Sequence, residues 1–369
     1  MAALLRWRGP APRSSAARSG PTAGAAATVK DRGNQAQQRS SRRSRLRIVV
    51  TGGSGFIGRH VVGALLARGD QPVVVGRRRF PGDVESVVGD LRDPAVVAAA
   101  VRPGIDGIVH LAGVKSVLRS VEDPHGVFLD NVAVTEALLE RNRATAGAPV
   151  VFASTNALCG DVGDRLIDES VVPRPLTPYG ASKAACEALL SAYAGSYGIR
   201  SVALRITNVY GPGMEEREGG IVAAVMRAAR RDEPLVVHGD GGQRRDYLYV
   251  TDAVDALLLA LGLPDPAVFT VGAGRDVSVN ELVELASVAA GRPIAVRHVD
   301  AEKREMPRVA VDASRFRAAG FAPAVSLEEG LRQTWRSFQA MPDPTPAAPA
   351  RPPATARPPA PTPGPTPVA

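Results

Sequence analysis

A glycine-rich turn near the start of the folded region limits the possible folds more than any other feature. In "RIVVTGGSGFIGRHVV", Gly52, Gly55 and Gly58 stand between a predicted strand, Arg47–Thr51, and a predicted helix, Ile57–Arg68. Glycines permit a tight turn and let a pyrophosphate approach the backbone, while the helix N-terminus supplies amide donors. Because a strand precedes the turn and a helix follows it, we interpret it as a dinucleotide-binding turn.

Short apolar runs alternate with helical patterns along the rest of the chain. This alternation predicts an α/β fold, a Rossmann-type doubly wound parallel sheet with a smaller C-terminal substrate-binding lobe. The further predicted strands are Val73–Val75, Val87–Gly89, Ile108–Ala112, Val150–Ser154, Val202–Ile206, Leu235–His238 and Phe269–Val271. The further predicted helices are Pro124–Arg143, Tyr179–Tyr197, Ile221–Arg230, Ala253–Leu261, Asn280–Ala290 and Leu327–Phe338.

Composition separates both ends of the chain from its middle. Met1–Arg47 holds eleven Lys and Arg against one acid, so this segment carries more positive charge than the net +8 of all 369 residues. We expect residues 1–45 to be a disordered basic tail and residues 341–369, rich in Pro, Ala and Thr, to be a second one. Between them, residues 46–210 are predicted to form the dinucleotide-binding domain with the catalytic residues, and residues 211–340 the smaller substrate-binding lobe.

Composition also bounds the partners and the compartment. The two cysteines, Cys159 and Cys186, make no disulfide framework, which favours a reducing cytoplasm. No apolar run is long enough for a signal peptide or a membrane span, so we expect no membrane partner. The basic tail offers only Trp7 to stack on a base, and we expect no nucleic-acid partner. We expect no metal site.

A tyrosine and a lysine four residues apart are the candidate catalytic pair. Tyr179 and Lys183, in "PYGASKAACE", share one face of the predicted helix. A free tyrosine has a pKa of about 10. A lysine ammonium beside it, with a cationic nicotinamide nearby, favours the phenolate, which can exchange a proton with a substrate hydroxyl or carbonyl near neutral pH. Upstream, "VFASTNALCG" places two hydroxyl side chains, Ser154 and Thr155, at the end of a predicted strand.

These motifs resemble the short-chain dehydrogenase/reductase superfamily. The glycine spacing and the Thr-Tyr-Lys set carry the resemblance, which covers about residues 47–338. It extends to the branch of nucleotide-sugar epimerases, dehydratases and reductases through "HLAGVKSVLRSVEDP", "LDNVAVTEALLE", "LRITNVYGPG", "GDGGQRRDYLYVTD" and "VSLEEGL". "HLAGVKSV" is particularly similar to the UDP-galactose 4-epimerases. Cys159 departs from the family pattern, which commonly has a tyrosine there.

The resemblance implies a role for each matching residue. Thr155 best matches the third catalytic hydroxyl of the superfamily, with its neighbour Ser154 as the alternative, and it would act with Tyr179 and Lys183. Residues 211–340 would be the nucleotide-sugar-binding lobe, and Asn208 and Arg245 would hold the nucleotide diphosphate of the substrate. The implied cofactor contacts are Gly52, Gly55, Phe56, Ile57, Gly58, Arg77, Asp90, Leu91, Leu111, Ala112, Gly113, Lys115, Asn131, Tyr179 and Lys183.

Two of these assignments have alternatives. Arg245 could instead form a salt bridge with Asp246 or Asp252. The last diphosphate contact of the family could fall on Arg304 or Arg308, and the sequence leaves this choice open.

An arginine run bears on the cofactor. "PVVVGRRRF" places Gly76 and Arg77 where NAD enzymes of this fold carry an acid for the adenosine ribose, so the run favours NADP(H), with NAD possible. Asn156 and Ala157 stand where the 4,6-dehydratases of the family have Asp-Glu, which argues against dehydration.

Together these features favour an NAD(P)H-dependent 4-ketoreductase of a dTDP-4-keto-6-deoxyhexose. The alternative is an NAD-dependent nucleotide-sugar 4-epimerase, and a third hypothesis is a non-catalytic dinucleotide sensor. The resemblance also implies a homodimer built on the two long helices.

Overall fold

A computed structural model describes residues 45–214, 220–300 and 306–342. The expected basic tail over residues 1–44 and most of the expected Pro-rich tail, from residue 343, lie outside the described residues. The element bounds, in chain order, are β1 (Arg47–Thr51), α2 (Phe56–Ala67), β2 (Gln71–Gly76), β3 (Glu85–Val88), α3 (Pro94–Ala100), β4 (Gly107–His110), α4 (Val117–Glu122), α5 (Pro124–Phe128), the π-helical turn η1 (Leu129–Ala133), α6 (Val134–Thr145), β5 (Val150–Thr155), the 3-10 turn η2 (Asn156–Cys159), α7 (Pro178–Tyr197), β6 (Ser201–Ile206), β7 (Asn208–Tyr210), α8 (Ile221–Arg231), β8 (Leu235–His238), β9 (Arg244–Tyr249), α9 (Val250–Leu261), β10 (Ala267–Val271), β11 (Asp276–Ser278), α10 (Val279–Ala290), β12 (Val296–Val299), β13 (Arg308–Val309), α11 (Ser314–Ala318) and α12 (Leu327–Gln339).

A parallel sheet of seven strands forms the larger part of the fold. Its order is β10-β6-β5-β4-β1-β2-β3, and every neighbouring pair is parallel. The chain runs outward from β1 in one direction through β2 and β3, and then crosses to β4 and continues the other way. The carboxyl ends of β1 and β4 therefore flank the point where the strand order reverses, which is where such sheets bind ligands.

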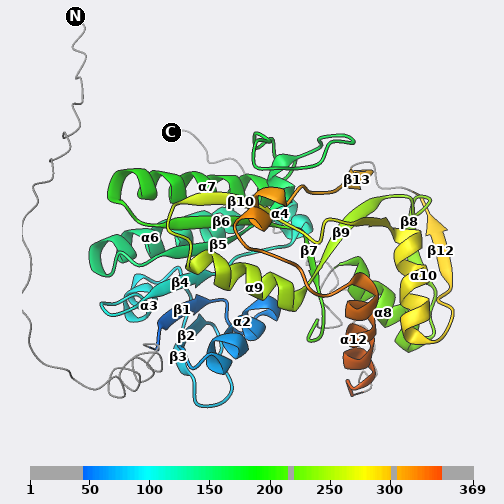
Figure 1. Ribbon diagram of the computed structural model, residues 1–369, viewed down its shortest axis with the longest axis horizontal. Helices are drawn as coiled ribbons and strands as arrows, with labels where there is room; N and C mark the ends of the chain where they lie inside the picture. The colour runs from blue at the N-terminus through cyan, green and yellow to red at the C-terminus, as the bar shows by residue number, and fades with distance from the viewer. Residues whose placement is uncertain (1–44, 215–219, 301–305, 343–369) are drawn as a thin grey trace, which may run out of the picture. The chain divides into compact units, whose positions relative to one another are not determined.

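Helices cover both faces of this sheet (Figure 1). Along β1, Ile48 and Val50 face the core under α2 and α9, while Val49 faces the core under α3, α6 and α7. Because both faces are covered, the inner strands are apolar at successive positions, and this is the pattern that predicted them. The doubly wound parallel sheet expected from the sequence is confirmed.

A second group of elements follows β6. Strand β9 pairs with β7 and β13 in parallel and with β11 antiparallel, and β8 pairs with β12. Helices α8, α10 and α12 pack around a separate core that includes Tyr210, Met226, Leu282 and Phe338. This group is the smaller C-terminal lobe of the expected fold class (Figure 1).

The two groups of elements are interleaved along the chain. Strand β10 and helix α9 lie within the expected lobe segment 211–340, yet β10 pairs with β6 at the edge of the large sheet and α9 packs on its face. Short apolar runs carry no information about which sheet they join, so a boundary drawn at residue 210 cannot capture this return.

The helix expected over Pro124–Arg143 is interrupted. It consists of α5, the π-helical turn η1 and α6, which ends at Thr145. Within the turn, the Asn131 carbonyl accepts a hydrogen bond from Thr135 Oγ1 at 2.6 Å. The extra residue of a π turn shifts the facing of the side chains around it, which periodicity over a long segment does not reveal.

Candidate functional site

The glycine turn forms a narrow cradle at the end of β1. Gly52 has φ 67°, and a Cβ there would lie 2.9 Å from the Ala112 amide nitrogen. A Cβ on Gly58 would lie 2.3 Å from the Gly52 carbonyl oxygen, whereas on Gly55 the nearest atom, the same oxygen, would be 3.1 Å away. Gly52 and Gly58 are therefore required by close backbone approach. Among the described residues, no side chain caps the helix that starts at Phe56.

The first two residues of α2 have side chains directed into the protein. Phe56 is buried in the core of the smaller lobe, and Ile57 packs partly against both cores. Their expected role as cofactor contacts therefore rests on their backbone amides, which lie in the first turn of the helix.

Thr51, the last residue of β1, links the glycine turn to the segment after β4. Its hydroxyl accepts hydrogen bonds from the amides of Leu111 and Ala112, at 3.2 and 3.1 Å. The same oxygen lies 2.7 Å from His110 Nδ1. An oxygen that already accepts two amides donates its own proton, so His110 Nδ1 is the acceptor in this pair.

His110 is buried and neutral between two threonines. Thr135 Oγ1 donates to the Asn131 carbonyl and therefore accepts from His110 Nε2 at 3.0 Å. Burial and the nearby charge of Lys183 lower the pKa of His110 to about 3. The imidazole thus acts as a fixed bridge from β1 to the start of α6, and it is not available as an acid or base near neutral pH.

Asn131 connects the loop after β4 to the catalytic helix. Its Oδ1 accepts the Val114 amide at 2.7 Å, and its Nδ2 donates to the Val114 carbonyl at 3.1 Å and to Ser182 Oγ at 2.9 Å. Gly113 has φ 147°, and a Cβ there would lie 2.6 Å from Asn131 Oδ1 and 4.0 Å from Lys183 Nζ. The turn η1 therefore places Asn131 between the loop after β4 and helix α7.

The three expected catalytic side chains meet at the carboxyl end of β5. Thr155 ends the strand, is 9% exposed, and accepts the Ala157 amide at 3.2 Å. Tyr179 lies in the first turn of α7, whose N-terminus is capped by Thr177. Burial raises the pKa of Tyr179, and a hydrogen bond with Thr155 opposes that shift. Of these two effects the exclusion of water is the larger. The expectation that Lys183 and a cationic nicotinamide together favour the phenolate stays a prediction.

Lys183 is the third member of this set. It is 6% exposed, its Nζ donates to the Ala153 carbonyl at 2.8 Å, and it stands 4.4 Å from the centroid of the Phe152 ring. Burial lowers the pKa of Lys183 to about 8, opposed by Cys186 and Glu187. Lys183 is thus held by the backbone of β5 beside the groove.

Ser154, the alternative to Thr155, faces a different partner. Its Oγ donates to Glu187 Oε1 at 2.5 Å, in the interior beneath the groove. Successive side chains of a strand point to opposite faces, so only one of the two hydroxyls can face Tyr179. The geometry favours Thr155.

The residues expected at the adenosine end lie on the loops after β2 and β3. Asp90 is bound by Arg92, with Nη2 2.9 Å from Oδ2, and this hydrogen bond is the main cause of the lowered pKa of Asp90. Leu91 is buried and Arg77 is exposed. A Cβ built on Gly76 would meet Ser54 Oγ at 3.5 Å, an ordinary contact.

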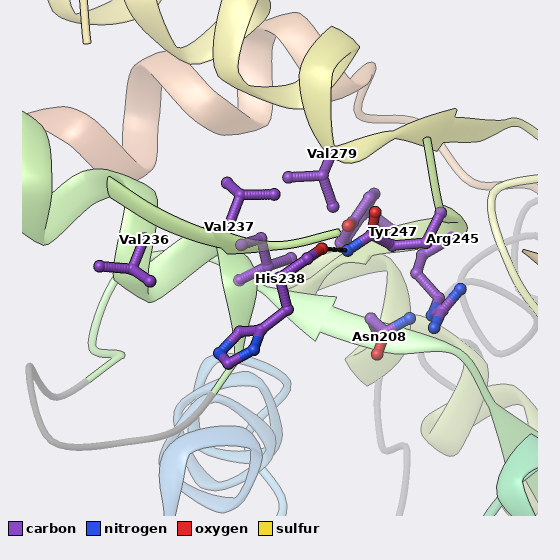
Figure 2. Close-up of a pocket in the computed structure, with 9 residues that line it drawn as sticks. Asn208, Val236, Val237, His238, Arg245, Tyr247 and Val279 are labelled. Atoms are coloured by element: carbon purple, nitrogen blue, oxygen red, sulfur yellow. Dashed lines mark hydrogen bonds between the residues drawn. The ribbon is translucent and has the colours of Figure 1, made fainter. Parts of the chain in front are cut away.

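The two expected substrate residues share one pocket of about 240 Å³ (Figure 2). Asn208 comes from β7 and donates its Nδ2 to the Asp246 carbonyl at 3.2 Å, and Arg245 comes from the adjacent β9. Sequence reasoning missed the other lining residues, namely Ile221, Val236, Val237, His238, Gln243, Tyr247 and Val279. They come from segments scattered over the lobe and carry no common motif.

The alternative partners of Arg245 have other roles. Asp246 accepts the amides of Ala273 and Gly274 at 2.9 and 2.8 Å. Asp252 accepts the amides of Ala324 and Val325 at 3.0 and 3.2 Å. These carboxylates organise loops of the lobe.

The remaining candidates differ in their surroundings. Lys115 is exposed in the loop before α4. Arg308 forms an ion pair with Asp276 at 3.0 Å, which it shares with Arg244 at 2.9 Å. This pairing supports a structural role for Arg308, and Arg304 lies outside the described residues.

None of the helices within the described ranges combines the length and apolarity needed to cross a bilayer.

Comparison with known proteins gives consistent relatives. A putative UDP-glucose 4-epimerase of Methanocaldococcus jannaschii is 30% identical over 294 residues, which is 78% of this chain and 96% of the relative. A dTDP-glucose 4,6-dehydratase of Streptomyces niveus is 31% identical, covering 78% and 91% of the two chains. The crystal structure of the Thermus thermophilus UDP-glucose 4-epimerase complex with NAD has TM-score 0.75 at 36% identity, over 80% of this chain and 99% of that one.

A family model covers most of the described chain. Residues 48–272 match the NAD dependent epimerase/dehydratase family, from the first strand to the end of the large sheet. The match includes the glycine cradle, the Thr155–Tyr179–Lys183 cluster and, in the pocket, Asn208 and Arg245. This chain therefore belongs to the NAD-dependent epimerase/dehydratase family of the extended short-chain dehydrogenases/reductases.

Proposed function

We propose that this protein is an NAD-dependent nucleotide-sugar 4-epimerase. The observation that carries the proposal is the meeting of Thr155 and Tyr179 at the strand end between a dinucleotide cradle and a separate pocket with Asn208 and Arg245. The relatives named above favour this activity over the 4-ketoreductase expected from the sequence.

The glycine cradle fits the cofactor. Gly52 and Gly58 approach neighbouring backbone too closely for any side chain, and the first turn of α2 offers amides to a pyrophosphate. Asn131 holds the opposite wall through Val114. When bound, NAD supplies a hydride acceptor for sugar C4 and a positively charged nicotinamide ring.

Tyr179 moves the proton of the sugar O4 hydroxyl. A positive ring nearby and the Lys183 ammonium together favour the phenolate and offset the effect of burial. Tyr179 takes the O4 proton as the hydride leaves C4, and the sugar becomes a 4-ketose. Thr155 holds O4 by hydrogen bonding. Tyr179 then returns the proton to O4, and hydride returned to the opposite face of C4 would invert that carbon with no net use of cofactor.

The residues that follow Thr155 are not acidic, and this decides whether a 4-ketose in the site can be dehydrated. Asn156 and Ala157 follow Thr155 in η2. Neither side chain can remove or deliver the proton that dehydration across two sugar carbons needs. A 4-ketose formed in this site therefore returns to the starting oxidation state.

The pocket in the smaller lobe suits the nucleotide half of the substrate. Arg245 offers a planar fork of donors for diphosphate oxygens, and Asn208 lies beside it (Figure 2). Val236, Val237 and Val279 add apolar wall for a base. By similarity to the named relatives, the substrate is UDP-glucose or UDP-galactose.

The protein acts as a homodimer in this proposal. Apolar side chains are exposed along α4 and α5, including Leu118 at 69% and Phe128 at 51%. Phe128 also lines a second pocket with Pro124, Pro178 and Ala181, where α5 meets α7. Covering this face removes apolar surface from water.

The test is a paired assay of the purified wild-type enzyme. An epimerase carries bound NAD and interconverts UDP-glucose and UDP-galactose without added cofactor. A 4-ketoreductase carries no cofactor and oxidises one NADPH for each dTDP-4-keto-6-deoxyhexose. The second pattern would contradict the proposal.

A further inference from the structure

A buried ion pair lies directly beneath the catalytic cluster. Arg205 of β6 and Glu187 of α7 are 4% and 8% exposed, and their Nη2 and Oε2 atoms are 2.9 Å apart. Arg205 Nε lies 3.2 Å from both Glu187 oxygens, so the guanidinium binds the carboxylate along its edge. Arg205 Nη1 also donates to the Val171 carbonyl at 3.3 Å.

This pair is joined to the residue that precedes Thr155. Ser154 Oγ donates to Glu187 Oε1 at 2.5 Å and is itself 6% exposed. The carboxylate therefore ties the carboxyl end of β5 to the middle of α7. Tyr179, Lys183 and Glu187 follow one another at four-residue spacing on that helix, so all three lie on one face.

Stability alone does not explain such an arrangement. Removing two charges from water costs several kcal/mol, and replacing a buried ion pair with apolar residues is often neutral or stabilising. The pair instead fixes the distance between the strands and α7. A bidentate ion pair and the hydrogen bond from Ser154 together allow little movement of the helix along the strands. Thr155 and Tyr179, the two groups that must meet at the sugar O4, sit on this strand and this helix.

We propose that Ser154, Glu187 and Arg205 are positioning residues that hold Thr155 and Tyr179 in hydrogen-bonding register. The inference rests on the proposed function for the identity of the reaction, but not for the geometry. Without the Ser154 hydrogen bond, the end of β5 shifts relative to α7, and Thr155 no longer meets Tyr179 at the distance that proton transfer requires.

The test compares two buried serines. Ser154→Ala should lower kcat for UDP-sugar epimerisation about tenfold, with KM for the sugar and affinity for NAD changed less than about twofold. Ser201→Ala is the matched control. It removes a buried hydroxyl, bonded to the Ile199 carbonyl, at the other end of the adjacent strand β6, and it should leave kcat unchanged. Equal kcat in wild type and Ser154→Ala would overturn the proposal.

A second comparison removes the ion pair without leaving either charge alone. The double variant Glu187→Leu/Arg205→Met should show the same kcat loss as Ser154→Ala. Adding Ser154→Ala to it should cause no further loss, because both changes break one connection. If the kcat losses of the double variant and of Ser154→Ala multiply in the triple variant, this inference is contradicted. If the double variant does not fold, the comparison of Ser154→Ala with Ser201→Ala tests the proposal.

A titration separates this inference from the proposed function. Tyrosinate absorbance of wild type minus Tyr179→Phe gives the pKa of Tyr179 without any substrate. Loss of the Thr155 hydrogen bond removes an interaction that lowers this pKa, so Ser154→Ala should raise it. A wild type without UDP-sugar turnover refutes the proposed function alone, whereas an unchanged Tyr179 pKa in Ser154→Ala refutes the positioning role.

Discussion

The cofactor cradle and the nucleotide pocket are assembled in different ways. The glycines of the cradle lie in one continuous stretch, a strand, a turn and a helix, in which Gly58 meets backbone only a few residues away and Gly52 meets the segment just after β4. The pocket takes residues from β7, β8, β9, α8 and α10, separated by loops and by the return of α9 to the large sheet. A site formed by consecutive residues can be recognised in the sequence as a motif. A site formed by distant segments that pack together is represented in the sequence only by isolated residues.

Substitutions in the two sites should therefore change different measurements, NAD affinity for the cradle and KM for the pocket. Substitution of Tyr179 should lower turnover most. Tyr179→Phe keeps the ring but removes the hydroxyl that takes the sugar proton. Turnover should fall at least about a hundredfold, the scale for one general acid or base, while NAD still binds. The measurement is kcat together with NAD affinity, and near-normal turnover would remove Tyr179 from the mechanism.

Gly58→Ala tests whether the cradle is a steric requirement. Its Cβ would lie 2.3 Å from the Gly52 carbonyl oxygen and 2.6 Å from Gly53 Cα, so the variant should lose about 1–3 kcal/mol of stability and most NAD affinity. Calorimetry and NAD titration measure both.

Gly63→Ala is the matched control on the same helix. Apart from its neighbours and the backbone of its own helix, no described heavy atom lies within 4 Å of a Cβ built there, so this variant should gain about 0.5–1 kcal/mol. Similar behaviour of the two alanine variants would contradict the steric account of the cradle.

Arg245→Met tests the pocket without touching the cradle. The loss of a charge-assisted hydrogen bond of about 1.5–3 kcal/mol should raise KM for the UDP-sugar roughly tenfold to a hundredfold. NAD affinity should stay the same. Arg275→Met, which alters an exposed ion pair with Glu328, is the control and should leave KM unchanged. A change in NAD affinity with an unchanged KM would show that Arg245 contacts the cofactor and not the nucleotide sugar.

Arg77→Asp has the smallest expected effect because Arg77 is exposed. It places an acid near the adenosine ribose, so the ratio of NAD affinity to NADP affinity should rise by roughly tenfold. Competition binding of the two cofactors measures it. An unchanged ratio would show that the arginine run lies away from the ribose.

The sequence predicted the sheet well and the smaller lobe poorly, for a physical reason. Buried parallel strands are apolar throughout, so β1, β2, β4, β5 and β6 could be recognised one at a time. Strands β7, β9, β11, β12 and β13 were missed. They are short or mixed in polarity, and they exist because distant segments pair with them.

The same division applies within the site. Local spacing identified the glycines, Tyr179 and Lys183, and the resemblance added Thr155 and Asn131. The contacts that hold these residues could not be predicted. No sequence pattern predicts the hydrogen bond between Ser154 and Glu187, because it joins separate elements of the fold. The same holds for the position of His110 between Thr51 and Thr135.

Following the sugar C4 hydrogen tests the central claim most directly. The wild-type enzyme is given UDP-glucose carrying deuterium at C4, with no added cofactor, and the UDP-galactose formed is analysed by NMR. The account predicts that deuterium remains at C4 in the epimerised product, because the hydride removed from the sugar returns to the same carbon. Loss of the label to water, or no UDP-galactose at all, would contradict it.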